Sequence, residues 1–84
     1  MSKKVFYFER TDLFGGECNY CWINLFAVKA TTERGAVNVL SRIIGLNHRF
    51  DGMKYVSRSG ATAFYNVSDD MPDHAIEAFK PVNF

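Results

Sequence analysis

The sequence has little of what marks a secreted scaffold, a membrane protein or a strongly charged binding protein. It contains two cysteines among 84 residues, and no apolar stretch of signal length follows Met1. We therefore expect free thiols in a reducing compartment, the cytoplasm. No run approaches the ~20 apolar residues of a membrane span, so no membrane association is expected. The net charge of +1 is too small to indicate a charged partner by itself.

What the chain does contain is apolar and aromatic bulk. Hydrophobic residues make up 48% of the sequence and aromatic residues 15%, which excludes a disordered chain. A chain this short buries only about 60–65% of its unfolded surface, so its core is thin and large rings must fill it. We expect residues 1–84 to form one domain. The rings expected in its core are Phe6, Phe8, Phe26, Tyr55 and Phe64.

Apolar periodicity and turn residues predict the order β-β-α-β-β-α. Short apolar runs predict the strands, and Gly-Gly, Asp-Gly and Ser-Gly pairs mark turns. The simplest packing is an α+β two-layer sandwich, in which a four-stranded antiparallel sheet carries both helices on one face. The expected strands are residues 3–10, 18–30, 53–58 and 61–67, and the expected helices are residues 33–45 and a short segment capped by 68–70 and ended by Pro81.

The helix over residues 33–45 has the clearest signals. Thr32 can cap its first turn, and Gly45 is a natural stop. The strand over residues 18–30 is apolar on both faces and is predicted to be central. The strand over residues 3–10 is instead a candidate edge, which could pair with its copy in a second molecule. The oligomeric state is therefore left open between monomer and homodimer.

Cys18 and Cys21 form a Cys-x-x-Cys spacing. A redox pair of this kind normally opens a helix, whose dipole lowers the thiol pKa, but a strand is expected here. A zinc site would need His48 and His74, which fall on different predicted elements. The remaining interpretation is a pair of small side chains pointing to opposite sides of a strand. No catalytic constellation remains, so we expect no enzyme, no metal and no cofactor.

Charge is distributed unevenly along the chain. Residues 29–58 are mainly basic and residues 69–77 mainly acidic. Either these charges solvate outer faces, or the molecule has two poles that meet charged partners. Polar side chains one turn apart on the predicted helix could follow a phosphate backbone or an acidic protein, although the RNA-recognition-motif signature is missing. These side chains are Arg34, Asn38 and Arg42. The acidic candidates are Asp69, Asp70 and Asp73, which could instead cap the last helix.

Aromatic side chains at the entrance of the second strand favour a protein partner. Tyr20 and Trp22 follow the Gly-Gly turn and are candidate interface rings, although Trp22 could instead belong to the core. A chain of 84 residues leaves little room for a pre-organised pocket, so an interaction module is expected rather than an enzyme.

The segment from Ala27 to Arg42, a strand followed by a threonine cap and an amphipathic helix, precedes a predicted β-hairpin. In this pattern residues 23–67 resemble small phage-encoded proteins that include several anti-CRISPR inhibitors, many of them more acidic than this chain. The resemblance implies a non-catalytic inhibitor in the host-cell cytoplasm. It would dock on a host defence protein or ribonucleoprotein complex and block nucleic-acid target binding or nuclease recruitment. The alternative is a small regulatory module that binds nucleic acid through the basic middle segment.

Overall fold

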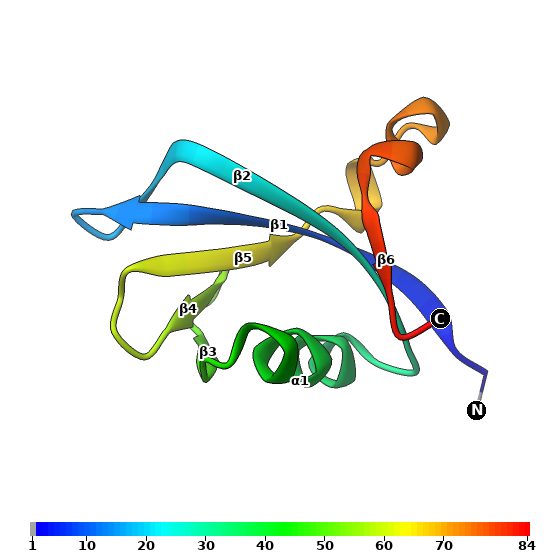
Figure 1. Ribbon diagram of the computed structural model, residues 1–84, viewed down its shortest axis with the longest axis horizontal. Helices are drawn as coiled ribbons and strands as arrows, with labels where there is room; N and C mark the ends of the chain where they lie inside the picture. The colour runs from blue at the N-terminus through cyan, green and yellow to red at the C-terminus, as the bar shows by residue number, and fades with distance from the viewer. Residues whose placement is uncertain (1) are drawn as a thin grey trace.

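The computed structural model describes residues 2–84, apart from the side chain of Asp70. One sheet runs through the molecule, with a helix on one side and two short helical turns on the other (Figure 1). The α+β class expected from the sequence is confirmed. The elements in chain order are β1 (Lys4–Phe14), β2 (Glu17–Ala30), α1 (Glu33–Ile44), β3 (His48–Phe50), β4 (Tyr55–Ser57), β5 (Thr62–Asn66), the 3₁₀ turns η1 (Ser68–Asp70) and η2 (Asp73–Ala78), and β6 (Lys80–Val82).

The sheet is mixed and has six strands in the order β3-β4-β5-β1-β2-β6. The long β1–β2 hairpin sets its register, with Phe6 opposite Val28. β6 runs parallel to β2 and pairs with residues 26–28. The prediction of a four-stranded antiparallel sheet is therefore wrong. It omits β3 and β6, which have three residues each; β6 also contains Pro81, which argues against a strand when the sequence is read alone.

β1 lies inside the sheet rather than at its edge. It pairs with β2 on one side and with β5 on the other. The prediction that residues 3–10 form an exposed edge is therefore wrong for residues 8–10, which β5 covers. Because β6 pairs only with residues 26–28, residues 17–25 of β2 have β1 on one side and, among the described residues, no strand on the other.

α1 begins and ends where its capping residues predict. The Thr32 Oγ1 accepts a hydrogen bond from the Gly35 N–H at 3.0 Å, and Gly45 ends the helix in the left-handed conformation with φ 80°. The helix packs on the sheet face that carries Phe8 and Phe64, whose rings meet edge to face with centroids 5.5 Å apart. The residues it buries are Ala36, Val37 and Leu40. All five rings expected in the core lie in this cluster or pack against it.

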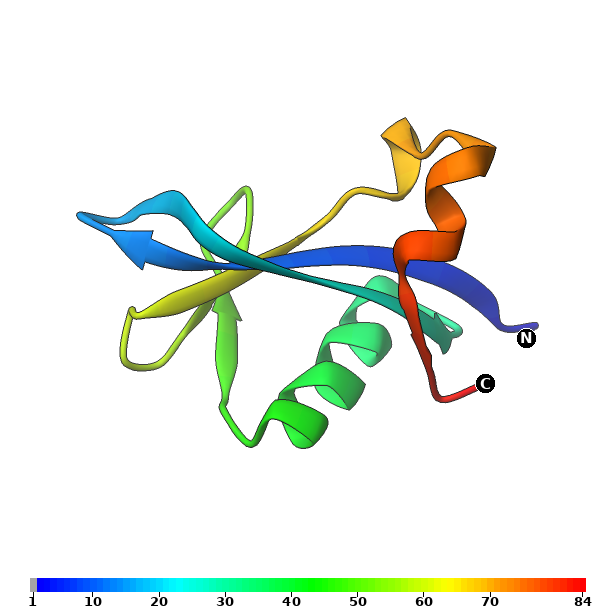
Figure 2. The same ribbon diagram turned by 45° about the horizontal axis from the view of Figure 1, so that its top comes forward.

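The last predicted helix is instead the pair of 3₁₀ turns, which lie on the side of the sheet away from α1 (Figures 1 and 2). Pro72 disfavours helical backbone at the preceding residue, and Pro81 cannot continue a helix, so too few residues remain for a stable α-helix. Phe79 is buried edge-on against the ring of Tyr7 at 5.3 Å. The prediction that both helical segments share one face is therefore wrong.

Candidate functional site

The free end of the β1–β2 hairpin, residues 11–23, is called the arm here; it reaches past the β4–β5 turn (Figure 1). Its register is irregular. Thr11 lies opposite Ile23 and Leu13 lies opposite Cys18. Between these two pairs β2 advances by five residues while β1 advances by only two. A bulge of this kind re-aims side chains and occurs often beside functional sites.

Two β1 side chains hold the bulge in place. The Asp12 carboxylate accepts hydrogen bonds from the Asn19 side-chain amide and from the Cys21 backbone N–H, both at 2.9 Å. The Thr11 Oγ1 accepts the Tyr20 backbone N–H at 3.0 Å. The hydrogen bond from Asn19, and then the one from Cys21, hold the pKa of Asp12 below its usual range. The Asp12 carboxylate therefore remains charged near neutral pH and keeps accepting both bonds. The bulge is thus a fixed structure, with side chains replacing the lost ladder bonds.

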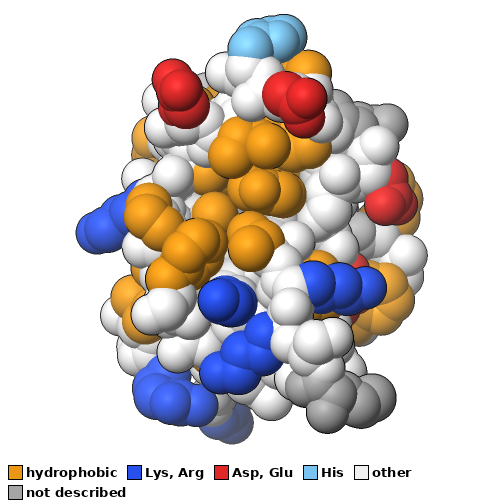
Figure 3. All heavy atoms as spheres, turned by 90° about the vertical axis from the view of Figure 1, so that its right-hand side faces the viewer, with side chains coloured by type: hydrophobic (Ala, Val, Ile, Leu, Met, Phe, Trp, Pro, Cys, Tyr) orange, Lys and Arg blue, Asp and Glu red, His pale blue; other side chains and the backbone are white. Residues whose placement is uncertain are grey.

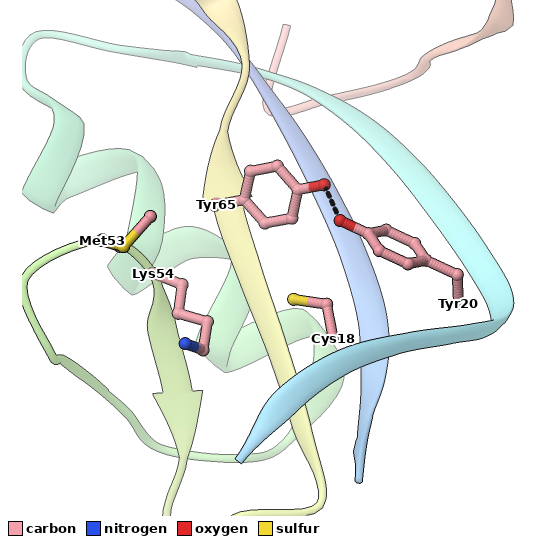
Figure 4. A pocket seen from close by; sticks show the side chains of 5 residues that line it. All are labelled: Cys18, Tyr20, Met53, Lys54 and Tyr65. Atoms are coloured by element: carbon pink, nitrogen blue, oxygen red, sulfur yellow. Dashed lines mark hydrogen bonds between the residues drawn. The ribbon is translucent and has the colours of Figure 1, made fainter. Parts of the chain in front are cut away.

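Tyr20 has a left-handed backbone with φ 57°. A residue with a side chain stores of order 1–3 kcal/mol of strain in that conformation. The ring does not fill the core, because it is 48% exposed. Instead it points across the sheet to β5, where its hydroxyl lies 2.6 Å from the Tyr65 hydroxyl (Figure 4). The Tyr65 hydroxyl donates to the Glu9 carboxylate, so the Tyr20 hydroxyl is the donor to Tyr65.

Tyr65 is held in its neutral form. Burial first, and then the hydrogen bond to Glu9, raise the pKa of Tyr65 far above its ordinary value. Its hydroxyl therefore keeps its proton near neutral pH and is not available as a base. The chain from Tyr20 through Tyr65 to Glu9 positions two rings rather than moving a proton.

These rings line a hollow of about 220 Å³ on the sheet face away from α1 (Figure 4). Its wall comes from β2, from β5 and from the segment just before β4, and the Cys18 sulfur points into it. The volume lies below the ~300–1,000 Å³ of most small-molecule sites. It suits one side chain of a partner. The lining residues are Cys18, Tyr20, Met53, Lys54 and Tyr65.

Trp22 lies outside the core and is 39% exposed. The Arg10 guanidinium lies over its ring, 5.0 Å from the centroid, which holds one face of the indole by a cation–π contact. Phe14 and Ile23 are also exposed on the arm. The arm therefore carries four large exposed apolar side chains, of which Tyr20 and Trp22 are fixed by named contacts.

The other predicted partner-binding residues lie on different surfaces. Three are exposed on the solvent side of α1, and two acidic residues are exposed on η1 and η2 across the sheet. The structure does not bring these groups to Tyr20 and Trp22. The helix residues are Arg34, Asn38 and Arg42, and the acidic residues are Asp69 and Asp73; the side chain of Asp70 lies outside the described part.

The face of the molecule near β6 and η2 carries both acidic and basic side chains (Figure 3). Acidic side chains lie at the top and along the right edge of this face, lysine and arginine side chains lie mostly in its lower half, and apolar side chains lie between them (Figure 3). Ile76 and Phe84 are among the exposed large apolar residues of this C-terminal part.

The cysteines and histidines do not converge. Cys21 is exposed on the bulge, whereas His48 is buried, with its Nδ1 2.8 Å from the Leu46 carbonyl oxygen. His74 is exposed on η2. Within the part of the chain that the structure describes, no three His, Cys, Asp or Glu side chains come close enough to hold a metal ion.

Sequence reasoning misses four residues that build this site: Glu9, Thr11, Asp12 and Tyr65. A local signal exists for Thr11 and Asp12, because short polar side chains before a Gly-Gly turn often bond nearby backbone. Glu9 and Tyr65 meet only because the β1–β5 register places them opposite each other. A contact between residues 56 positions apart has no local signal.

Comparisons of this chain with known protein families, with curated proteins and with solved structures find no match. Among the described residues, no helix has the length and apolar character needed to cross a membrane. The proposed function therefore rests on the exposed side chains of the arm and on the hollow beside it.

Proposed function

We propose that this protein binds another protein through the arm and acts as a small non-catalytic inhibitor. The observation that carries the proposal is the backbone of Tyr20, which is strained while its ring stays half exposed. Strained residues persist where the surrounding structure imposes them, and they cluster at functional sites. In this protein the strain sets the direction of a surface ring.

Fixed rings suit an interface. A few aromatic and arginine residues supply most of the binding energy of protein interfaces. Immobilising a free side chain on binding costs about 0.5–1.5 kcal/mol. Tyr20 is already held by Tyr65, and Trp22 by Arg10, so much of that cost is met on folding.

The bulge also indicates how a partner docks. An unbroken edge strand accepts another strand, but a bulge interrupts the ladder and blocks such pairing. We therefore expect recognition by side chains, with one apolar side chain of the partner in the 220 Å³ hollow. Lys54 is held 3.5 Å from Asp51 and Tyr65 keeps its proton, which supports binding rather than acid–base chemistry in this hollow.

The target class follows only from the resemblance to anti-CRISPR inhibitors. A host defence complex, whose target binding or nuclease recruitment is blocked, stays a prediction. The near-neutral net charge favours recognition by shape and aromatic contacts over mimicry of nucleic acid.

The test is affinity capture from nuclease-treated bacterial lysate with the tagged protein and three variants. Tyr20→Ala and Trp22→Ala remove the fixed rings, and Phe84→Ala removes an exposed ring far along the chain as the matched control. We expect one partner protein with wild type and control, and at least about a thirtyfold loss with either arm variant, the effect of a typical hot spot. Equal capture by all four proteins, with unchanged circular dichroism, would contradict the proposal.

A further inference from the structure

A second hollow lies at the outer strand pair of the sheet, β3 and β4. It has a volume of about 410 Å³ and is lined by Asn47, His48, Arg49 and Arg58. The Arg58 backbone N–H donates to the Asn47 carbonyl at 3.0 Å, and Arg49 lies opposite Val56. The two arginines are therefore diagonal neighbours across this strand pair. This hollow is called the basic cleft below.

The charges of the basic cleft are uncompensated. Arg49 and Arg58 are both exposed, and within the described part of the chain neither forms an ion pair. Both arginines line one cleft, so an anion bound there can neutralise both charges. Asn47 is also exposed, and its amide can donate to the same anion.

His48 contributes a wall of the cleft rather than charge. It is buried, and its Nδ1–H donates a hydrogen bond to the Leu46 carbonyl oxygen at 2.8 Å. Burial first lowers the pKa of His48, and the charge of Arg10 lowers it further. The cleft therefore owes its positive charge near neutral pH to its two arginines.

We propose that the basic cleft binds the phosphate group of a phosphate-bearing ligand, either a nucleotide or the backbone of a nucleic acid. A guanidinium group presents paired N–H donors whose geometry matches two phosphate oxygens. Arg49 and Arg58 line one cleft and can hold one phosphate together. The cleft volume of about 410 Å³ lies within the ~300–1,000 Å³ range of ligand sites and exceeds what a single phosphate group needs.

The basic cleft is separate from the protein-docking arm. The lining residues of the cleft and of the Tyr20–Tyr65 hollow do not overlap. Tyr20→Ala should therefore leave phosphate binding unchanged, and failure of the docking proposal would leave this inference standing.

The experiment is titration calorimetry with adenosine monophosphate and with an oligothymidylate of about ten nucleotides, at about 50 mM salt, where backbone contacts are strong. Arg49→Ala and Arg58→Ala test the cleft. Arg34→Ala removes an exposed arginine of α1 and is the matched control. We expect saturable binding of at least one probe, weakened about tenfold by each cleft variant and unchanged in the control.

The two probes distinguish the source of the phosphate. Binding of the mononucleotide indicates a nucleotide site, whereas binding of the oligonucleotide alone indicates a nucleic-acid backbone. For the oligonucleotide, each cleft variant should reduce the slope of log affinity against log salt by about 0.7. The proposal is overturned if neither probe saturates, or if Arg34→Ala weakens binding as much. A glutamate-rich peptide that binds as tightly, with the same dependence on Arg49 and Arg58, would also overturn it by assigning the cleft to protein carboxylates.

Discussion

The hydroxyl chain from Tyr20 through Tyr65 to Glu9 makes a quantitative prediction. Tyr65→Phe removes a group that donates to a half-buried carboxylate and accepts from Tyr20. A hydrogen bond to a charged group contributes about 1.5–3 kcal/mol, and one between neutral groups about 0.5–1.5 kcal/mol. Because Tyr65 and Glu9 remain partly accessible to water, the lower ends apply. We expect Tyr65→Phe to lower the free energy of unfolding by about 2 kcal/mol.

Tyr20→Phe removes only the neutral bond and should lower the free energy of unfolding by about 0.5 kcal/mol. In the double variant the Tyr65→Phe substitution has already removed the hydrogen bond between Tyr20 and Tyr65, so Tyr20→Phe removes nothing further. The double variant should therefore lose about 2 kcal/mol, as Tyr65→Phe does alone, which corresponds to a coupling of about 0.5 kcal/mol between the two sites.

Thermal unfolding followed by circular dichroism measures these changes. In a domain of this size 1 kcal/mol corresponds to about 4–8 °C, so Tyr65→Phe should lower the Tm by about 8–16 °C. Tyr7→Phe is the matched control, because its ring packs on Phe79 and its hydroxyl has no hydrogen-bond partner among the described residues. Strictly additive losses, or a loss in Tyr7→Phe as large as that in Tyr65→Phe, would refute the reasoning.

Two further predictions concern the core. Because burial lowers the pKa of His48, the unfolded chain binds more protons below about pH 6.5, so His48 contributes stability that is present above that pH and is lost as the pH falls. In urea unfolding His48→Gln should flatten this dependence between about pH 8 and 5, and an unchanged slope would contradict the assignment. Leu40→Ala, at a fully buried position, should cost about 2–5 kcal/mol, whereas Ile43→Ala on the exposed side of α1 should cost under about 0.5 kcal/mol; equal losses would contradict this packing.

The helix and the core could be predicted because their signals are local. Thr32 and Gly45 mark the ends of α1, and the apolar period between them selects its buried side. Large aromatic rings gain most by burial, and a short chain offers a single core, so rings such as Phe8 and Phe64 are buried there.

The bulge could not be predicted, because its signal is misleading. Asn19 and Tyr20 are adjacent, and asparagine adopts left-handed backbone more readily than tyrosine, yet Tyr20 is the residue that does so. The rings of Tyr20 and Trp22 stand out in the sequence as candidates. The contacts that fix them, to Tyr65 and Arg10, depend on strand register and on long-range pairing.

The arm and the basic cleft present different chemistries on one sheet. Ser57 lies opposite His48, whose Nδ1 is 3.2 Å from the Ser41 hydroxyl of α1, so both face α1. The adjacent Val56 therefore points to the opposite face, and Arg49 lies opposite Val56. Tyr65 follows the buried Phe64 and points to that same face. A partner lying across this face would therefore meet Arg49 at one side and the Tyr20–Tyr65 hollow at the other. A protein alone would use only the arm, and a nucleotide only the cleft. A ribonucleoprotein carries both a protein surface and a phosphate backbone, so we propose it as the partner class that would use both sites.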